Sequence, residues 1–517
     1  MTNVQKLEHD LIRAVRQLRI ADSLLFLNKV LAVSRGEVDD PETRALLARQ
    51  QPNETPAFVI HIIVRYLLQH GRMNTISVLD ASNFLQVRRC AFRLAIADPL
   101  ADSSDASVHG YLVRMMSQQM QRQIIAQSYG LAIGLFQDLD AVVGPKPIDL
   151  RREVEDAIKM PVELFMQLGQ AAHAATCAQL GSVHLRGTLN LDWLSKAAID
   201  IPGIPWVEKW PDFARVTALD QQTFNAEVER CNVNSEYAYG LSPLRRHPLI
   251  QVSTDRFIAV DPSLVVERTS WGVFYDIFEK YQKADELSAF TEPFGYAFER
   301  FVDNLLQSVL PADSIWRETE SPSAEQIKKS KGKTHQIGDL AYRSTSNPVL
   351  IEVASLRPTR EFCALARKED LQKAAKRIAE EVRQTLDHIR SIQTNAWSEE
   401  GLAPGQWVGL VVTFGRFETI NSPFFRRLID EQLGADASKP YLVLSLVELD
   451  CVVKLVEGGR DFGSLIAQFA AKPSFDPVGG GYEEELRSDA VSSFAKARTA
   501  RMYDFLPPTS PMLPSPQ

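Results

Sequence analysis

Hydrophobic residues in the first 180 positions recur with the spacing of α-helices. The repeat is carried first by Leu7, Leu11, Ala14 and Leu18, and then by Leu24, Leu27, Val30 and Leu31. The same spacing continues through residues 59–68 and 113–135, and prolines at 41, 52, 56, 145 and 147 interrupt it. Residues 1–190 are therefore predicted to form a mostly α-helical N-terminal region.

The next hundred residues change character. The stretch 201–212 is rich in proline and tryptophan, as expected of a long loop or boundary. Residues 248–266 predict two short strands around Ser253–Arg256, with Pro262 ending the second strand, and Gly272–Gln282 predicts a helix. Residues 191–290 are thus expected to be a linker and a small α+β region.

From position 291 the pattern alternates between helix and strand. It predicts a helix at 293–309, strands at 314–319, 336–343 and 349–355, a helix at 368–393, and strands at 406–413 and 441–446. These elements predict an α/β domain over 291–460 with a mixed central sheet flanked by helices. Residues 461–517 are expected to be a C-terminal extension with a disordered end, since 506–517 are mainly proline and serine.

Composition narrows the class of protein. The 517 residues suggest about three domains, and the net charge of 57 − 65 = −8 excludes a globally basic nucleic-acid binder. Five scattered cysteines without a CxxC pair argue against a zinc ribbon or a disulfide scaffold. No apolar run is long enough for a membrane span, and no GxxxxGK[ST] motif marks an ATP site. We expect a soluble cytoplasmic protein with no membrane partner.

Two carboxylates fall where strands are predicted. Asp339 follows Ile337 and Gly338, and Glu352 stands inside the apolar run 349–354. If 336–343 and 349–355 are adjacent antiparallel strands, both side chains lie near one end of the sheet. A carboxylate inside an apolar strand is costly unless it is paired or binds a cation, which singles out Glu352.

A third carboxylate comes from the helix predicted at 293–309. Glu299 falls just beyond the margin of its apolar stripe and is placed to reach the sheet. Oxygen ligands of this kind suit Mg²⁺ or Mn²⁺, which can activate water for phosphodiester hydrolysis.

This arrangement resembles the PD-(D/E)XK nuclease superfamily, with its restriction-endonuclease-like fold, over about residues 291–450. The family's helix glutamate matches Glu299, its aspartate matches Asp339, and its E-x-K motif matches Glu352-Val353-Ala354. The resemblance implies that Asp339 and Glu352 bind the metal ion, that the Val353 carbonyl completes the coordination, and that Glu299 is an auxiliary ligand. It departs at the motif lysine, where this chain has Ala354.

The family tolerates relocation of that lysine to the following helix. In 368–393, Lys373, Arg377, Gln384 and His388 share one flank beside the apolar face. We expect Lys373 to steady the nucleophile, with Arg377 as the second choice. A solvated helix flank is the alternative interpretation of both.

Basic residues near the expected site suggest a nucleic-acid surface. Across 317–390 there are 15 Lys/Arg against 11 Asp/Glu, a local excess in an acidic chain. Phosphate contacts are expected from Arg357, Arg360 and Arg377 and from the loop lysines Lys328, Lys329, Lys331 and Lys333. Solvated loops and surface salt bridges are the alternatives.

The sequence therefore predicts a metal-dependent nuclease acting on DNA, with a helical N-terminal region that senses a target, binds a protein partner or forms homo-oligomers. By analogy with the way such fusions are used, it is expected to act in bacterial defence against foreign DNA. The alternative is a catalytically inactive nuclease fold that serves as a nucleic-acid-binding or scaffold subunit.

Overall fold

The structure is a computed structural model. It describes residues 3–35, 37–48, 57–97, 109–110, 112–113, 125–140, 147–177, 188–190, 205–230, 242–317, 339–344, 346–359, 362–363, 366–394, 402, 405–417, 419–474, 478 and 491–501.

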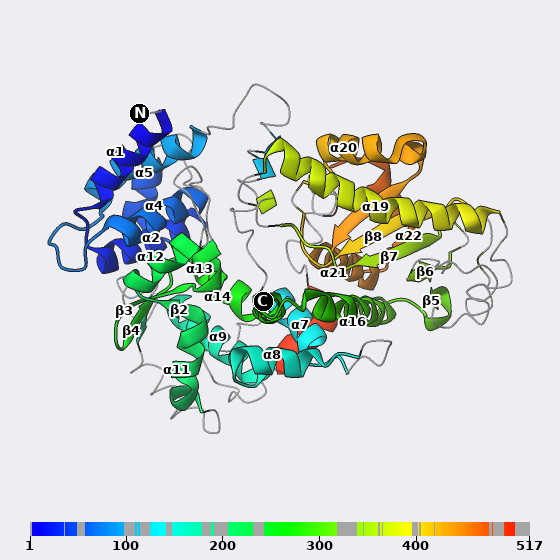
Figure 1. The fold of residues 1–517 in the computed structure, drawn as a ribbon, viewed down its shortest axis with the longest axis horizontal. Coiled ribbons are helices and arrows are strands. Elements are labelled where there is room, and N and C mark those ends of the chain that lie inside the picture. Colours follow the sequence, from blue (N-terminus) through cyan, green and yellow to red (C-terminus); the bar gives the residue numbers. More distant parts are fainter. Residues whose placement is uncertain are drawn as a thin grey trace.

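The described residues between 3 and 96 are mainly helical, as the hydrophobic spacing predicts. The helices are α1 (Asn3–Val15), α2 (Ile20–Ser34), α3 (Pro41–Ala48), α4 (Ala57–His70) and α5 (Ala81–Ile96). They gather at one end of the molecule (Figure 1), around a hydrophobic core that they share with buried residues from Leu219 to Leu264 of the middle region. Helix α4 lies at the centre of this bundle, because its side chains from Phe58 to Leu68 are all buried.

The remaining helices of the predicted N-terminal region belong to a different core. They are α7 (Ile125–Phe136), α8 (Leu150–Ile158) and α9 (Val162–Cys177). Their buried residues join a cluster that also contains one face of the C-terminal sheet. Where the structure describes residues up to 177, the predicted helical character is confirmed, but the helices divide between two cores, and residues 188–190 form a strand.

The middle of the chain forms a small sheet with helices. Its four strands, in spatial order, are β1 (Thr188–Asn190), β4 (Arg256–Ile258), β3 (Leu249–Ser253) and β2 (Ala218–Leu219). The helices are α11 (Trp206–Thr217), α12 (Gln221–Arg230), α13 (Ser242–Arg246), α14 (Pro262–Thr269) and α15 (Val273–Lys283).

The predicted strand pair is present, but its second strand ends before Pro262. Strand β4 stops at Ile258, and Pro262 begins α14 instead, with Asp261 as the N-cap residue. Proline suits the first turn of a helix because the amide that it lacks would have no intrahelical partner there.

A buried acid at the start of α14 ties the middle region to the N-terminal bundle. The Arg35 guanidinium donates to Asp261 Oδ1 at 2.8 Å, and His61 Nε2 lies 3.0 Å from Oδ2. Burial opposes ionisation of Asp261, but the His61 hydrogen bond and the Arg35 charge outweigh it and hold the pKa of this carboxyl well below its usual range. Residues of α2, α4 and α14 are thereby joined in one ionic contact.

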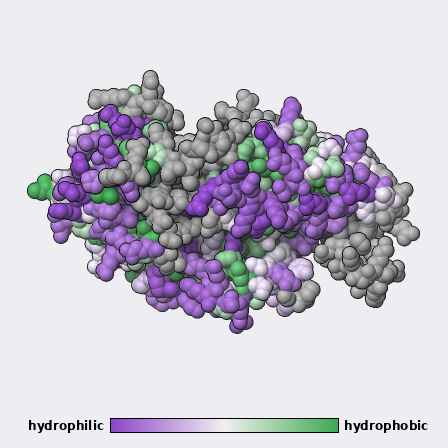
Figure 2. Space-filling model, turned by 45° about the horizontal axis from the view of Figure 1, so that its top comes forward, coloured by the Kyte–Doolittle hydropathy of each residue, from purple (hydrophilic) through white to green (hydrophobic). Residues whose placement is uncertain are grey.

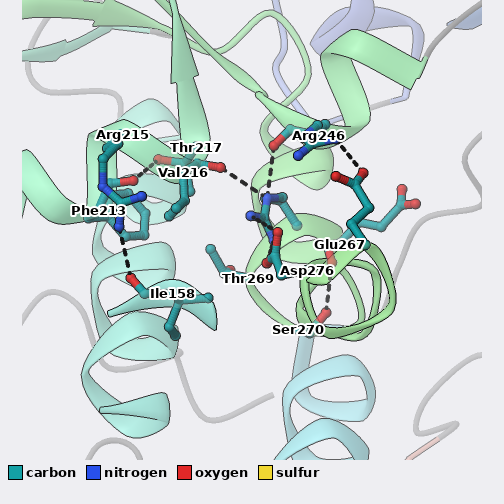
Figure 3. Close-up of polar contacts among 12 residues, drawn as sticks. Ile158, Phe213, Arg215, Val216, Thr217, Arg246, Glu267, Thr269, Ser270 and Asp276 are labelled. Atoms are coloured by element: carbon teal, nitrogen blue, oxygen red, sulfur yellow. Dashed lines mark hydrogen bonds and ion pairs between the residues drawn. The ribbon is translucent and has the colours of Figure 1, made fainter. Parts of the chain in front are cut away.

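A buried arginine in α14 holds the middle helices together, and Figure 3 labels its partners Asp276, Val216 and Arg246. Arg268, 3% exposed, donates to both oxygens of Asp276 at 2.8 and 3.0 Å. Its Nε also donates to the carbonyls of Val216 and Arg246, at 3.2 and 2.8 Å. One guanidinium thus connects α14 with α15 and with the C-terminal ends of α11 and α13.

The C-terminal half contains a mixed five-stranded sheet, as the alternating pattern predicts. The strands follow chain order: β5 (Ile315–Arg317), β6 (Leu340–Tyr342), β7 (Val349–Ala354), β8 (Val408–Thr413) and β9 (Tyr441–Ser445). The pairs β5–β6 and β6–β7 are antiparallel, and β7–β8 and β8–β9 are parallel.

Helices cover both faces of this sheet. They are α16 (Leu287–Gln307), α19 (Lys368–Gln393), α20 (Pro423–Leu433), α21 (Leu446–Glu457) and α22 (Phe462–Ala471), with 3-10 turns at Ala312–Ser314 and Gly434–Ser438. Figure 1 shows α16 and α19 on opposite sides of the strands. The α19 bounds match the expected 368–393, whereas α16 begins six residues before the expected 293, since Phe290 extends its buried stripe by one turn.

Side chains of β7 alternate between the two helical layers. Val349, Ile351 and Val353 join the core that contains α16, while Leu350 and Ala354 join the core that contains α19. Glu352 shares the parity of the second set and therefore points to the α19 side.

The described part of the C-terminal extension packs against the rest of the chain. Helix α22 contacts the sheet, and α24 (Ser493–Arg501) lies along α7. The two backbones approach closely at Gly130, where an added Cβ would lie 2.1 Å from the Ala495 carbonyl oxygen. The predicted disordered end, 506–517, lies outside the described residues.

A buried carboxyl fastens this extension. Asp450 of α21 accepts hydrogen bonds from the Ser492 hydroxyl and from Gln127 Nε2, the latter at 2.9 Å. Burial raises the pKa of Asp450 to about 6, although these two hydrogen bonds oppose the shift. Folding thus stabilises the protonated form of Asp450, which predominates up to about pH 6.

Asp450→Asn is expected to stabilise the protein more at neutral pH than in mild acid. Between the ordinary aspartate pKa near 4 and the folded value of about 6 the native state binds more protons than the unfolded state, so stability falls as pH rises. The wild type loses at most about 3 kcal/mol of unfolding free energy over this range. Urea unfolding of wild type and variant at about pH 4 and about pH 7 measures this loss as the change in their stability difference. An identical difference at both pH values would contradict this account.

None of the described helices is both long enough and apolar enough to cross a lipid bilayer. On the face shown in Figure 2 the described surface is mainly hydrophilic, and its hydrophobic residues are scattered in small groups.

Candidate functional site

The structure brings Asp339 and Glu352 together on neighbouring strands. The antiparallel register pairs Leu340 with Ile351, and its next step places Asp339 opposite Glu352. The Val353 amide donates a hydrogen bond of 2.7 Å to Asp339 Oδ2. The aspartate is thus fixed at the end of β6, directly beside the glutamate strand, as the expected antiparallel pairing requires.

Glu352 lies in an enclosed setting between sheet and helix. It is 7% exposed within a strand whose six residues are all buried. Its Oε1 accepts a hydrogen bond of 2.8 Å from the Gln384 side-chain amide of α19. Because a buried carboxylate is costly without compensation, this contact helps to hold a charged group at a chosen orientation.

The backbone of Val353 also faces this pair. Its N–H points to the β6 side of the strand, whereas the carbonyls of Pro348 and Ala354 accept bonds from the β8 side. In a strand the N–H and C=O of one residue point to the same side, so the Val353 carbonyl also lies on the Asp339 side.

The donor set of this pair fits a hard divalent cation. It combines two carboxylates from adjacent strands with a backbone carbonyl between them, all oxygen atoms of the kind that Mg²⁺ and Mn²⁺ prefer. Glu352 comes from a strand and is held by Gln384, so its position is set before any ion binds.

Glu299 is not part of a three-residue cluster with this pair. Within the described ranges no three His, Cys, Asp or Glu side chains are grouped to hold a metal ion. Glu299 belongs to α16, which packs on the face lined by Val349, Ile351 and Val353, opposite the face to which Glu352 points. Its auxiliary role stays a prediction.

The flank of α19 that the sequence singles out does face the carboxylate pair, but its residue in contact with the pair is Gln384. Lys373 is eleven residues earlier on α19, about 16 Å along the helix axis, and its side chain is exposed. Lys373 and Gln384 both belong to the described part of α19. Within the described residues, Lys373 forms no hydrogen bond or ion pair with Asp339 or Glu352. Arg377, on the same flank, is about 10 Å from Gln384 along the axis and half-buried.

Ala354 occupies the position of the family lysine and is buried against α19. Strand β7 and helix α19 run in opposite directions. Ala354 comes two residues after Glu352 on β7, so the α19 residues beside it come before Gln384 in the sequence. Arg377 is therefore nearer than Lys373 to the place that the motif lysine would reach.

Arg357 lies beyond the carboxyl end of β7 and rests on aromatic rings. Its guanidinium carbon is 3.7 Å from the Phe278 ring centre and 4.7 Å from that of Phe274. Burial lowers the pKa of Arg357 from its ordinary value, and the positive charge of Arg377 adds to this shift. Two cations thus lie near each other at the end of the sheet where phosphate contact is expected.

Sequence reasoning missed the contribution of α15 to this region. Phe274 and Phe278 are one helical turn apart, a spacing equally typical of an ordinary core face. The remaining predicted contacts, Lys328, Lys329, Lys331, Lys333 and Arg360, lie outside the described residues.

Comparison with known proteins supplies no name for this arrangement. Neither the protein-family models nor the curated proteins that were searched contain a match to this chain.

Proposed function

We propose that this protein is a metal-dependent nuclease that hydrolyses phosphodiester bonds in DNA. The observation that carries the proposal is the cross-strand pair of Asp339 and Glu352, with the aspartate held by the Val353 amide and the glutamate by Gln384.

The residues that would hold Mg²⁺ or Mn²⁺ are Asp339, Glu352 and the Val353 carbonyl. A divalent ion bound there would polarise the phosphoryl group and stabilise the charge that develops on it. The protein's own contribution is geometric, because Val353 and Gln384 keep both carboxylates in place.

Arg357 and Arg377 supply the positive charge that a phosphodiester needs. Both are half-buried, and the charge of Arg377 also acts on the half-buried Glu381 of the same helix. A phosphate on this side of the sheet would therefore meet Arg357, on which no described carboxylate acts, and would share Arg377 with Glu381. We assign the cation nearest the reacting phosphate to Arg377, with Lys373 farther along the same flank.

Ala354 favours the second candidate, a catalytically inactive nucleic-acid-binding or scaffold subunit. A lysine in that position normally orients the attacking water, and no described lysine contacts either carboxylate. Both candidates share the phosphate-binding surface, so cleavage and binding must be measured separately.

The decisive experiment is incubation of the purified full-length chain with plasmid and linear DNA in Mg²⁺, Mn²⁺ or EDTA. We expect cleavage with either metal, none in EDTA, and none from Asp339→Asn, because the donor set needs both carboxylates. DNA binding without cleavage under every metal condition would favour the inactive candidate and sink the nuclease proposal.

A further inference from the structure

Tyr275 is an aromatic residue that the fold leaves half exposed. It lies in the first turn of α15 and is 50% exposed. Among the described residues, the other exposed large hydrophobic side chains are aliphatic: Met73 at 38%, Ile76 at 96% and Val207 at 50%. An exposed tyrosine ring therefore needs a reason beyond the packing of α15, whose neighbour Phe274 is fully buried.

The ring stands beside the Arg357 guanidinium. The guanidinium carbon is 5.6 Å from the Tyr275 ring centre, and the same group stacks more closely on Phe278 and Phe274. Phe274 in turn packs on Phe294 and Phe414, with ring centres 4.8 Å apart in both cases. The cation and the exposed ring are thus mounted on a rigid aromatic cluster.

Arg357 is the charge that acts most strongly on the Tyr275 hydroxyl. Glu267 and Arg245 also act on it, with opposite effects, and they pair with each other at 3.7 Å. In the described chain Arg357 has no such carboxylate, and it has Arg377 as a neighbouring cation.

Chain connectivity limits the distance between this surface and the carboxylate pair. Arg357 is five residues after Glu352 in the same segment, so their Cα atoms lie at most about 18 Å apart. A strand of a few nucleotides is long enough to reach from the pair to Tyr275.

We propose that Tyr275 and Arg357 form a platform for single-stranded nucleic acid, with an unpaired base stacked on the tyrosine ring and its phosphate at the guanidinium. The place of this platform in the reaction rests on the proposed nuclease function. A duplex offers no free base face to a half-exposed ring, whereas a single strand or a frayed end does. The platform thus selects unpaired strands for the site.

The test is the affinity of the full-length chain for a fluorescent oligothymidylate and for a blunt DNA duplex, measured by anisotropy in EDTA. Because the assay contains no metal, it reports binding even if the protein cleaves nothing. We expect Tyr275→Ala to weaken single-strand binding by about tenfold, within the range for one stacked base, and to leave duplex binding unchanged. Tyr275→Phe keeps the ring and should bind like the wild type.

Salt dependence separates the two halves of the platform. Tyr275→Ala should shift the plot of log affinity against log salt without changing its slope, while Arg357→Gln should reduce the slope for single strands by about 0.7. Ile76→Ala, an exposed residue of the N-terminal bundle, is the matched control and should change neither quantity.

The proposal fails if Tyr275→Ala binds the single strand like the wild type, or if it weakens duplex binding equally. It also fails if Tyr275→Phe loses as much affinity as Tyr275→Ala, because the hydroxyl and not the ring would then be responsible. A chain that cleaves DNA but shows one of these results retains the nuclease function without the platform. A chain that shows the expected binding without cleavage retains the platform alone.

Discussion

Glu352→Gln is expected to lower metal-dependent DNA cleavage by about 10²–10³-fold, since a bound metal ion contributes several kcal/mol to transition-state stabilisation and each 1.36 kcal/mol is tenfold in rate. The substitution removes the charge but keeps the shape. The glutamine carbonyl oxygen still accepts the Gln384 hydrogen bond, so the fold should be preserved. Initial cleavage rates with saturating Mg²⁺, together with thermal melting of both proteins, measure the effect.

A matched control comes from the same domain. Glu380→Gln changes an exposed carboxylate of α19 and should leave the cleavage rate within about twofold of wild type, because long-range effects of surface charges are screened by salt. Equal activity of wild type and Glu352→Gln would show that the carboxylate pair is not the reaction site.

Arg268→Met is expected to cost about 3–5 kcal/mol of stability, the largest loss that we predict for a residue outside the site. The substitution leaves the Asp276 carboxylate, 16% exposed, without its bidentate partner, and it strips the carbonyls of Val216 and Arg246 of their donor. For a unit of this size that corresponds to a drop in melting temperature of roughly 10 °C or more. Differential scanning calorimetry of the full chain is the measurement.

The control is a surface ion pair of the same charge type. Arg151 and Glu155 lie 3.2 Å apart on α8 with side chains 53% and 33% exposed, so Arg151→Met should cost less than about 1 kcal/mol. The double variant Arg268→Met with Asp276→Leu should regain part of the loss, since no unpaired charge remains. A melting temperature for Arg268→Met within a degree or so of wild type would mean that Arg268 is not the central tie between these helices.

Local pattern was sufficient for the regular elements. The spacing of apolar residues predicted α19 with its observed bounds and the strands that became β7, β8 and β9, because each has one period over its whole length. The adjacency of the two carboxylates also followed from sequence, since a short turn between two apolar strands leaves little choice but antiparallel pairing.

The sequence by itself determined the helical first part, the mixed sheet and the Asp339 and Glu352 pair. Only the tertiary structure decided which core each helix joins, that Gln384 is the α19 residue in contact with Glu352, and that Tyr275 and Phe278 of α15 meet Arg357. The reason is physical. Periodicity within one element records which face is buried, but not which distant element covers it, because burial of an apolar side chain is favourable against any apolar partner.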